Sequence, residues 1–225
     1  MLQINFLKIR TTLIPAVIVI LFTSCSAKIY TKKDATRYTS KHNTVAIIPP
    51  KVKIEVRKRD NDEKRKAKQE QEVIESQNAQ NEEYSRLLQF VRKGKMHLEI
   101  QDIEKTNAIL LKINCPNGDC GMAPEQLAQA LGVDAIIESN YVFSSQKNIG
   151  LGITYAIIFF PYLTPLGIMM ACSPTNRADL NIKLVDGTTG YLLYSYNNKL
   201  SRLNKKFVDI VDKATKKAGK KIPYH

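Results

Sequence analysis

A pair of strands that fold back on each other constrains this chain more than any other feature. Within 178–186, leucine and isoleucine at every second position alternate with polar side chains, and a period of two predicts a half-buried strand. Asp-Gly and Thr-Gly pairs follow within 186–190, and these residues tolerate the positive φ of a tight turn. We therefore expect a second strand over 191–196, and a further strand over 132–143 to join the same sheet.

The stretch between the strands expected over 132–143 and 178–186 is long and apolar, and a sheet in a soluble protein does not need such a connection. From Asn148 to Asn176 there is no charged residue, and this length is enough for a membrane-spanning helix. Prolines at 161 and 165 would kink such a helix, because each removes a backbone donor. A kinked or re-entrant apolar hairpin, with halves 149–160 and 166–172, fits the prolines better. A loop packed on the protein's own core stays open as a third reading.

We predict that this insert, residues 149–172, carries the contact with membrane or with a partner. It leaves and re-enters the sheet between two strands that a short turn could otherwise join. The residues expected to make the contact are Ile153, Tyr155, Ile157, Ile158, Phe159, Phe160, Tyr162, Leu163, Leu166 and Ile168.

The first 25 residues predict export. Lys8 and Arg10 form a basic start, an apolar run from Thr11 to Phe22 follows, and small residues then precede Cys25. Residues 21–25 (Leu-Phe-Thr-Ser-Cys) resemble the lipobox of bacterial lipoproteins, which implies that Cys25 is acylated and becomes the mature N-terminus. No acidic residue follows the cysteine, which by the same resemblance favours the outer membrane, facing the periplasm. A plain signal peptide and an uncleaved anchor helix stay open as alternatives.

Removal of the signal leaves about 200 residues, enough for one domain with a proper core. We expect a polar tether over 26–43 and a single α/β domain over 44–225 that contains the insert. The formal net charge of +13 points to anionic lipid headgroups or other anionic envelope material, since an exported protein rarely meets nucleic acid. The basic residues are spread along the chain, which indicates mostly solvated faces.

The remaining elements alternate between strand and helix. A strand over 44–48 ends at two prolines, and the alternation over 51–56 predicts either a second strand or an extension beyond them. The expected helices are 60–93, with an apolar stripe only in its second half, 103–113 capped by Asp102, 124–131 ended by Gly132, and amphipathic 201–219. This order predicts an α/β sandwich, a mixed sheet of about four to five strands covered by helices.

Three segments resemble the curli-secretion lipoprotein family: its opening strand (45–50), its helix-to-strand step (127–137) and its hairpin (184–195). A similar layout occurs in the N-terminal domain of the Tol-Pal translocation protein and in lipoproteins that activate penicillin-binding proteins. The chain departs from the family at Glu138-Ser139, where a glycine is usual. Residues 149–170 do not alternate as the membrane-crossing hairpins of the curli channel do.

This resemblance implies an outer-membrane-anchored lipoprotein that is a non-catalytic assembly or regulatory component of an envelope machine, for secretion or cell-wall synthesis. The alternative is an oligomeric pore-forming secretion lipoprotein whose apolar insert enters the membrane. The expected partners are membrane lipid, through the N-terminal acyl chains, and an envelope protein or further copies of the chain; nucleic acid is not expected.

No set of residues predicts catalysis. His42 falls in the expected tether, His97 beside a short strand expected over 98–101 and His225 at the terminus, so we expect solvated histidines and neither a metal nor a cofactor. The acidic pairs fall on helical stretches that we expect to be exposed. The sequence therefore predicts a protein that is not an enzyme.

The four cysteines have different expected roles. With Cys25 assigned to lipid, Cys115 and Cys120 flank a short loop and predict a disulfide in an oxidising compartment. A zinc site would need two further ligands, which the sequence does not place nearby. Cys172, after the apolar run, is expected to be a buried free thiol.

Overall fold

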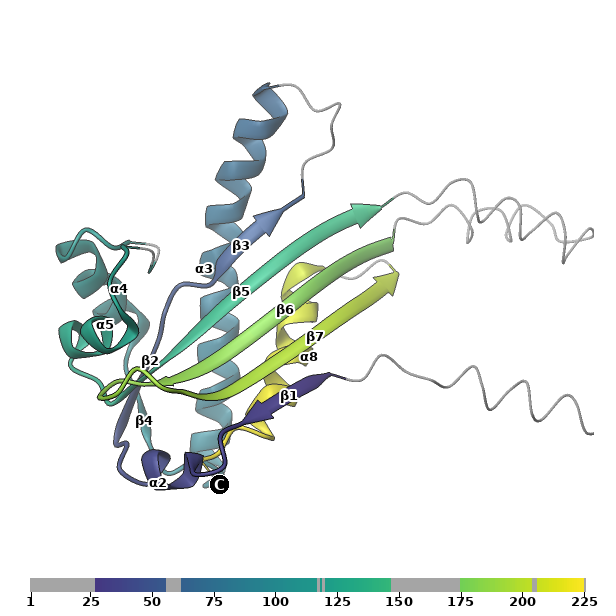
Figure 1. The fold of residues 1–225 in the computed structure, drawn as a ribbon. Helices are drawn as coiled ribbons and strands as arrows, with labels where there is room; N and C mark the ends of the chain where they lie inside the picture. The colour runs from purple at the N-terminus through teal and green to yellow at the C-terminus, as the bar shows by residue number, and fades with distance from the viewer. Residues whose placement is uncertain are drawn as a thin grey trace, which may run out of the picture.

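A computed structural model of the chain describes residues 27–55, 62–116, 118, 120–146, 175–203 and 206–224. Its elements are β1 (Lys28–Thr31), α2 (Ala35–Thr39), β2 (Thr44–Ile47), β3 (Lys51–Ile54), α3 (Asp62–Arg92), β4 (Glu99–Ile100), α4 (Ile103–Lys112), α5 (Pro124–Leu131), β5 (Ala135–Gln146), β6 (Thr175–Asp186), β7 (Leu192–Leu203) and α8 (Phe207–Gly219). In Figure 1, α3 and α8 lie behind the long strands β5, β6 and β7, and α4 and α5 lie at the end where β5 begins.

The strands form one mixed sheet in the order β1-β7-β6-β5-β2-β4, and β3 pairs with β5 beyond the end of β2. Strands β5, β6, β7 and β1 are antiparallel neighbours, whereas β2 and β3 run parallel to β5. A mixed sheet covered by helices confirms the predicted α/β sandwich. The sheet has seven strands where about four to five were expected. The strand that the sequence did not indicate is β1, whose four side chains are all exposed and show no apolar pattern.

Two prolines divide the parallel pairing along one side of β5 between two strands. β2 ends before Pro49 and Pro50, and β3 begins after them; Val45 lies opposite Ala135 and Val52 opposite Tyr141 along the same strand β5. Proline has no backbone N–H to donate to a ladder, so the pairing stops and then resumes. The alternation over 51–56 therefore marks a strand that continues along the same neighbour.

The sheet face toward α3 and α8 carries the main core. The three alternating apolar residues of β6 are buried there, as their period predicted. Phe207, at the start of α8, packs edge-on against Tyr141 and Phe143, with ring centroids 5.9 and 5.6 Å apart. This helix was predicted to start at 201; it starts later because β7 continues to Leu203, paired with Thr175 of β6.

A smaller core lies on the opposite face, at the end of the sheet where β5 begins. Ile48, Ile136 and Val185 from the sheet meet apolar residues of α4 and α5 there. The predicted helix ends are confirmed: the Asp102 carboxylate accepts hydrogen bonds from the first turn of α4, and Gly132 ends α5 with φ 68°. Because this core covers only one end, no helix of the described chain covers the rest of that face.

Helix α3 confirms the long helix predicted over 60–93. Its second half packs on the main core, whereas Val73 and Ile74 in its first half are exposed. The first half is fixed to β3 by polar contacts: Glu72 accepts the backbone N–H of Ile54 at 2.7 Å, and the Ser76 hydroxyl donates to the Pro50 carbonyl at 2.6 Å. Among the described residues, no helix has the length and apolar character needed to cross a membrane.

Residues 27–43, expected to be part of a polar tether, belong to the folded structure in the described chain. β1 pairs antiparallel with β7, from Lys28 opposite Asn197 to Thr31 opposite Tyr194, and α2 follows it. All four side chains of β1 are exposed, so the strand is held by backbone pairing and leaves no apolar pattern in the sequence.

Candidate functional site

The uncovered part of the sheet presents a continuous polar face, turned toward the viewer in Figure 1. Its members alternate along each strand with the side chains of the main core. We call this surface the open face, and it comprises Lys28, Tyr30, Lys51, Lys53, Glu138, Asn140, Val142, Arg177, Asp179, Asn181, Lys183, Ser195, Asn197 and Lys199. Polar residues dominate it because the strands there have core on one side only.

One row of side chains crosses the open face from edge to edge. Strand register places Lys51 opposite Asn140, Asn140 opposite Asn181, Asn181 opposite Asn197, and Asn197 opposite Lys28. Three asparagine amides are thus neighbours on adjacent strands, with a lysine at each end. At about 4.8 Å between strands, this row is roughly 19 Å long.

The open face is basic and partly connected by hydrogen bonds. Asn197 Nδ2 donates to Ser195 Oγ at 3.1 Å, and Ser195 Oγ donates to Asn181 Oδ1 at 3.4 Å. Lys199 Nζ lies 3.3 Å from Asp179, but both side chains are well exposed and such a pair contributes little to stability. Six basic residues stand against two acidic ones on this surface, which favours an anionic ligand.

Two hollows open on this face. The larger, about 430 Å³, is lined by all three asparagines of the row, by the polar or charged Lys28, Asp179, Asn198 and Lys199, and by the apolar Val142 and Leu180. The smaller, about 130 Å³, is lined by Lys51, Lys183, Glu138, Asn140, Asn181, Ser139 and Gly118, with Ile48 and Pro49 at its side. Together they follow the row from one lysine to the other.

A disulfide holds the loop that lines the smaller hollow. Cys115 and Cys120 are bonded, with sulfurs 2.11 Å apart. Gly118 between them has φ +68°, and a Cβ there would lie 2.1 Å from a methyl carbon of Ile48. The loop therefore needs glycine at this point to lie against the end of β2.

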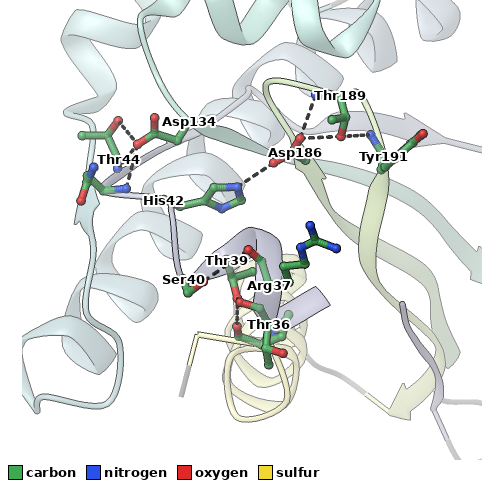
Figure 2. A network of polar contacts seen from close by, with 12 residues as sticks. Thr36, Arg37, Thr39, Ser40, His42, Thr44, Asp134, Asp186, Thr189 and Tyr191 are labelled. Carbon is green, nitrogen blue, oxygen red and sulfur yellow. Dashed lines mark hydrogen bonds and ion pairs between the residues drawn. The ribbon is translucent and has the colours of Figure 1, made fainter. Parts of the chain in front are cut away.

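Figure 2 shows a second polar cluster, which lies inside the fold. His42 is 6% exposed; its Nε2 lies 2.8 Å from Asp186 Oδ1 and its Nδ1 lies 2.8 Å from the Tyr224 hydroxyl. Asp186 also accepts the backbone N–H and the hydroxyl of Thr189. Burial would raise the pKa of Asp186, but hydrogen bonds from Thr189 and His42 lower it. The expectation of a solvated His42 was wrong. The side chain is buried, and its hydrogen bonds connect the N-terminal segment to the β6–β7 turn and to the C-terminus.

A third polar group lies in the main core. Glu83 of α3 is 1% exposed and accepts a hydrogen bond from the Tyr141 hydroxyl of β5. Burial raises the pKa of the Glu83 carboxyl to about 7, although the hydrogen bond from Tyr141 lowers it. Its other oxygen has no hydrogen-bond partner among the described residues. Because a carboxyl with no access to solvent cannot reach a substrate, we expect Glu83 to affect the stability of the fold.

Several residues singled out from the sequence lie outside the described part of the chain. These are Cys25, Cys172 and the ten residues of the insert named above, so lipidation and membrane contact stay predictions. Within the described ranges, no three His, Cys, Asp or Glu side chains are grouped so as to hold a metal ion. The sequence analysis did not predict the asparagine row, because one sequence does not show which residues of neighbouring strands lie opposite each other. The sequence feature that could have indicated it is the presence of polar residues at alternate positions of three strands.

No protein-family model matches the sequence, and a search of characterised proteins finds no match. Solved structures do show similarity in fold. Lipoprotein GNA1162 from Neisseria meningitidis aligns with a TM-score of 0.45 and 12% identity over 80% of this chain and 97% of its own. A PelC dodecamer from Paraburkholderia phytofirmans gives 0.39 and 9% over 88% and 96%. The C-terminal domain of LpoB from Salmonella enterica gives 0.33 and 9% over 76% and 96%. Similarity at this level carries no functional inference.

Proposed function

We propose that this chain is a lipid-anchored envelope protein without chemistry of its own, an assembly or regulatory component of a secretion or cell-wall synthesis machine at the outer membrane. The observation that carries the proposal is the open face, a basic and polar sheet surface with hollows but no candidate metal ligands grouped in the described chain. Such a surface suits binding.

The proposed anchor, Cys25, would lie close to this surface. Lys28 belongs to the open face and follows Cys25 by three residues, which span at most about 10 Å. β1 also starts toward the end of the sheet where β5 and β7 end and β6 begins (Figure 1). An acylated Cys25 would therefore hold the open face beside the membrane.

Site-specific crosslinking in intact membranes tests the proposal. A photo-crosslinking amino acid at Ile74, on the exposed part of α3, or at Asn140, on the open face, is expected to capture an envelope component. The matched control is Lys217, an exposed residue of α8. Specific products from either test position and none from Lys217 would support the proposal; identical backgrounds from all three would contradict it.

A pore-forming oligomer is a second candidate, favoured by the way β5 and β6 approach the insert. The two strands pair without interruption as far as Gln146 opposite Thr175, so both arms lead directly into the insert. The size of the detergent-extracted protein separates the candidates. A large uniform ring would support the pore, and a monomer or dimer would support the assembly component.

A further inference from the structure

We propose that the open face binds an acidic glycan, a sugar chain bearing carboxylate or phosphate groups, laid across the strands along the row from Lys51 to Lys28. This inference rests on the proposed function and names the ligand class for the open face. The asparagine row and the two hollows that follow it carry the argument.

The side chains of the row match the chemistry of such a chain. Each asparagine amide both donates and accepts hydrogen bonds, as sugar hydroxyls do. Lysines donate only, and suit carboxylate or phosphate oxygens. The Asn140 amide is exposed and makes no hydrogen bond to another described residue, so it is available to a ligand.

The spacing of the row matches a polymer. Successive asparagines lie on adjacent strands about 4.8 Å apart, close to the length of one sugar ring along a glycan. A chain of several sugars could thus place one unit over each strand. The larger hollow lies over the asparagines, and the smaller one extends the site toward Lys51. Because both are lined by Asn140 and Asn181, they form one continuous binding surface.

Charge and composition favour a glycan over the other possible occupants. The open face carries six basic residues against two acidic ones, Glu138 and Asp179, and this excess favours an anionic ligand. Val142 and Tyr30 are its only large apolar or aromatic members. Its apolar lining is confined to the larger hollow, where Val142 and Leu180 lie, whereas a large stable protein interface is apolar over a wider centre. A membrane surface would bind the lysines without using the amides between them.

The test measures binding of oligogalacturonate to the full-length lipidated protein in nanodiscs of zwitterionic lipid. We expect saturable binding that weakens with salt, and no comparable binding of neutral maltooligosaccharide of equal length. Asn181→Asp, which turns an amide donor in the row into an anion, and Lys51→Glu should each weaken binding about tenfold or more. Lys217→Glu changes charge equally on α8 and should alter the Kd less than twofold.

Each contrary result has a definite meaning. Equal weakening by Lys217→Glu would show that net charge alone attracts the glycan, and equal affinity for maltooligosaccharide would show that the ligand class is wrong. Displacement of the oligogalacturonate by short-chain phosphatidylglycerol at equal headgroup concentration would assign the face to the membrane. No binding by the unaltered protein would overturn the inference, while crosslinks from Asn140 to a protein would leave the proposed function standing. Lys51→Glu keeps the test valid if Asn181→Asp does not fold, because Lys51 is exposed.

Discussion

His42 illustrates how one buried side chain can join parts of a chain that are far apart in sequence. Its two ring nitrogens reach Asp186 and Tyr224, which lie 144 and 182 residues away. A lone histidine in a polar stretch gives no sign of such a role, because its partners depend on the fold of the whole chain. The cluster in Figure 2 thus fixes the N-terminal segment to the sheet.

We expect His42→Ala to lower the free energy of unfolding by about 2–3 kcal/mol, because two buried groups lose a hydrogen-bond partner. Urea denaturation of purified protein measures this loss. His97→Ala is the matched control, since His97 is exposed, and should change stability by less than about 0.5 kcal/mol. Equal effects of the two substitutions would show that the cluster does not stabilise the fold.

Glu83 makes stability depend on pH. Its pKa is about 7 in the folded protein and near 4.5 when unfolded, so between these values the folded state holds a proton that the unfolded state has released. Stability from this group is therefore fully present below about pH 4.5 and is lost as pH rises to about 7. The difference corresponds to roughly 3 kcal/mol.

Glu83→Gln should remove this pH dependence, because the amide cannot titrate and still accepts the hydrogen bond from Tyr141. Relative to the unaltered protein, the variant should gain roughly 3 kcal/mol of stability between pH 5 and pH 8. Denaturation curves at several pH values measure the gain. The exposed Glu70→Gln should leave the dependence intact, and an unchanged slope in Glu83→Gln would contradict the assignment.

At the scale of elements, the sequence predicted what local patterns determine. The alternation of β6, the Asp102 cap and the Gly132 stop were all confirmed, because each depends on neighbours within a few residues. β1 was missed because backbone pairing holds it and its side chains are exposed. The asparagine row was missed for a different reason, since it exists only once β5, β6 and β7 are in register.

We expect that the insert can be removed without unfolding the sheet. β5 and β6 are antiparallel neighbours paired through Gln146 and Thr175, so a short Gly/Ser turn in place of Ile149–Cys172 can join them. In a chain that also lacks residues 1–25, this change should leave a cooperative thermal melt and reduce self-association by size exclusion. An unfolded product would show that the insert belongs to the core.

The loop disulfide can be tested by its protection of thiols. Labelling of unfolded, unreduced mature protein should tag Cys172 and neither Cys115 nor Cys120. Replacing both loop cysteines with serine should lower the free energy of unfolding by only about 2–3 kcal/mol, because a disulfide that closes a short loop restricts the unfolded chain less than one that closes a long loop. The matched control Cys172→Ser is expected to leave the bridge between Cys115 and Cys120 intact. Labelling of all three thiols would contradict the bond.

At the scale of the whole molecule, Cys25 is the residue that tests whether the protein is a lipoprotein. We expect Cys25→Ser to abolish acylation and to leave the precursor uncleaved by the lipoprotein signal peptidase. Metabolic labelling with a fatty acid and the electrophoretic mobility of the product measure both effects. Cys172→Ser should be processed normally. Normal processing and full membrane retention of Cys25→Ser would remove the lipoprotein assignment.

β1 begins three residues after Cys25, so an acyl anchor at Cys25 would leave very little chain between the membrane and the fold. A protein anchored at Cys25 could not sweep through the space beyond the membrane, as one on a long linker would. Its search for a binding partner would be lateral diffusion within one leaflet, and its encounter rate would depend on copies per area and not per volume. The ligand would have to come to the bilayer, either as another membrane-attached molecule or as a polymer passing through it.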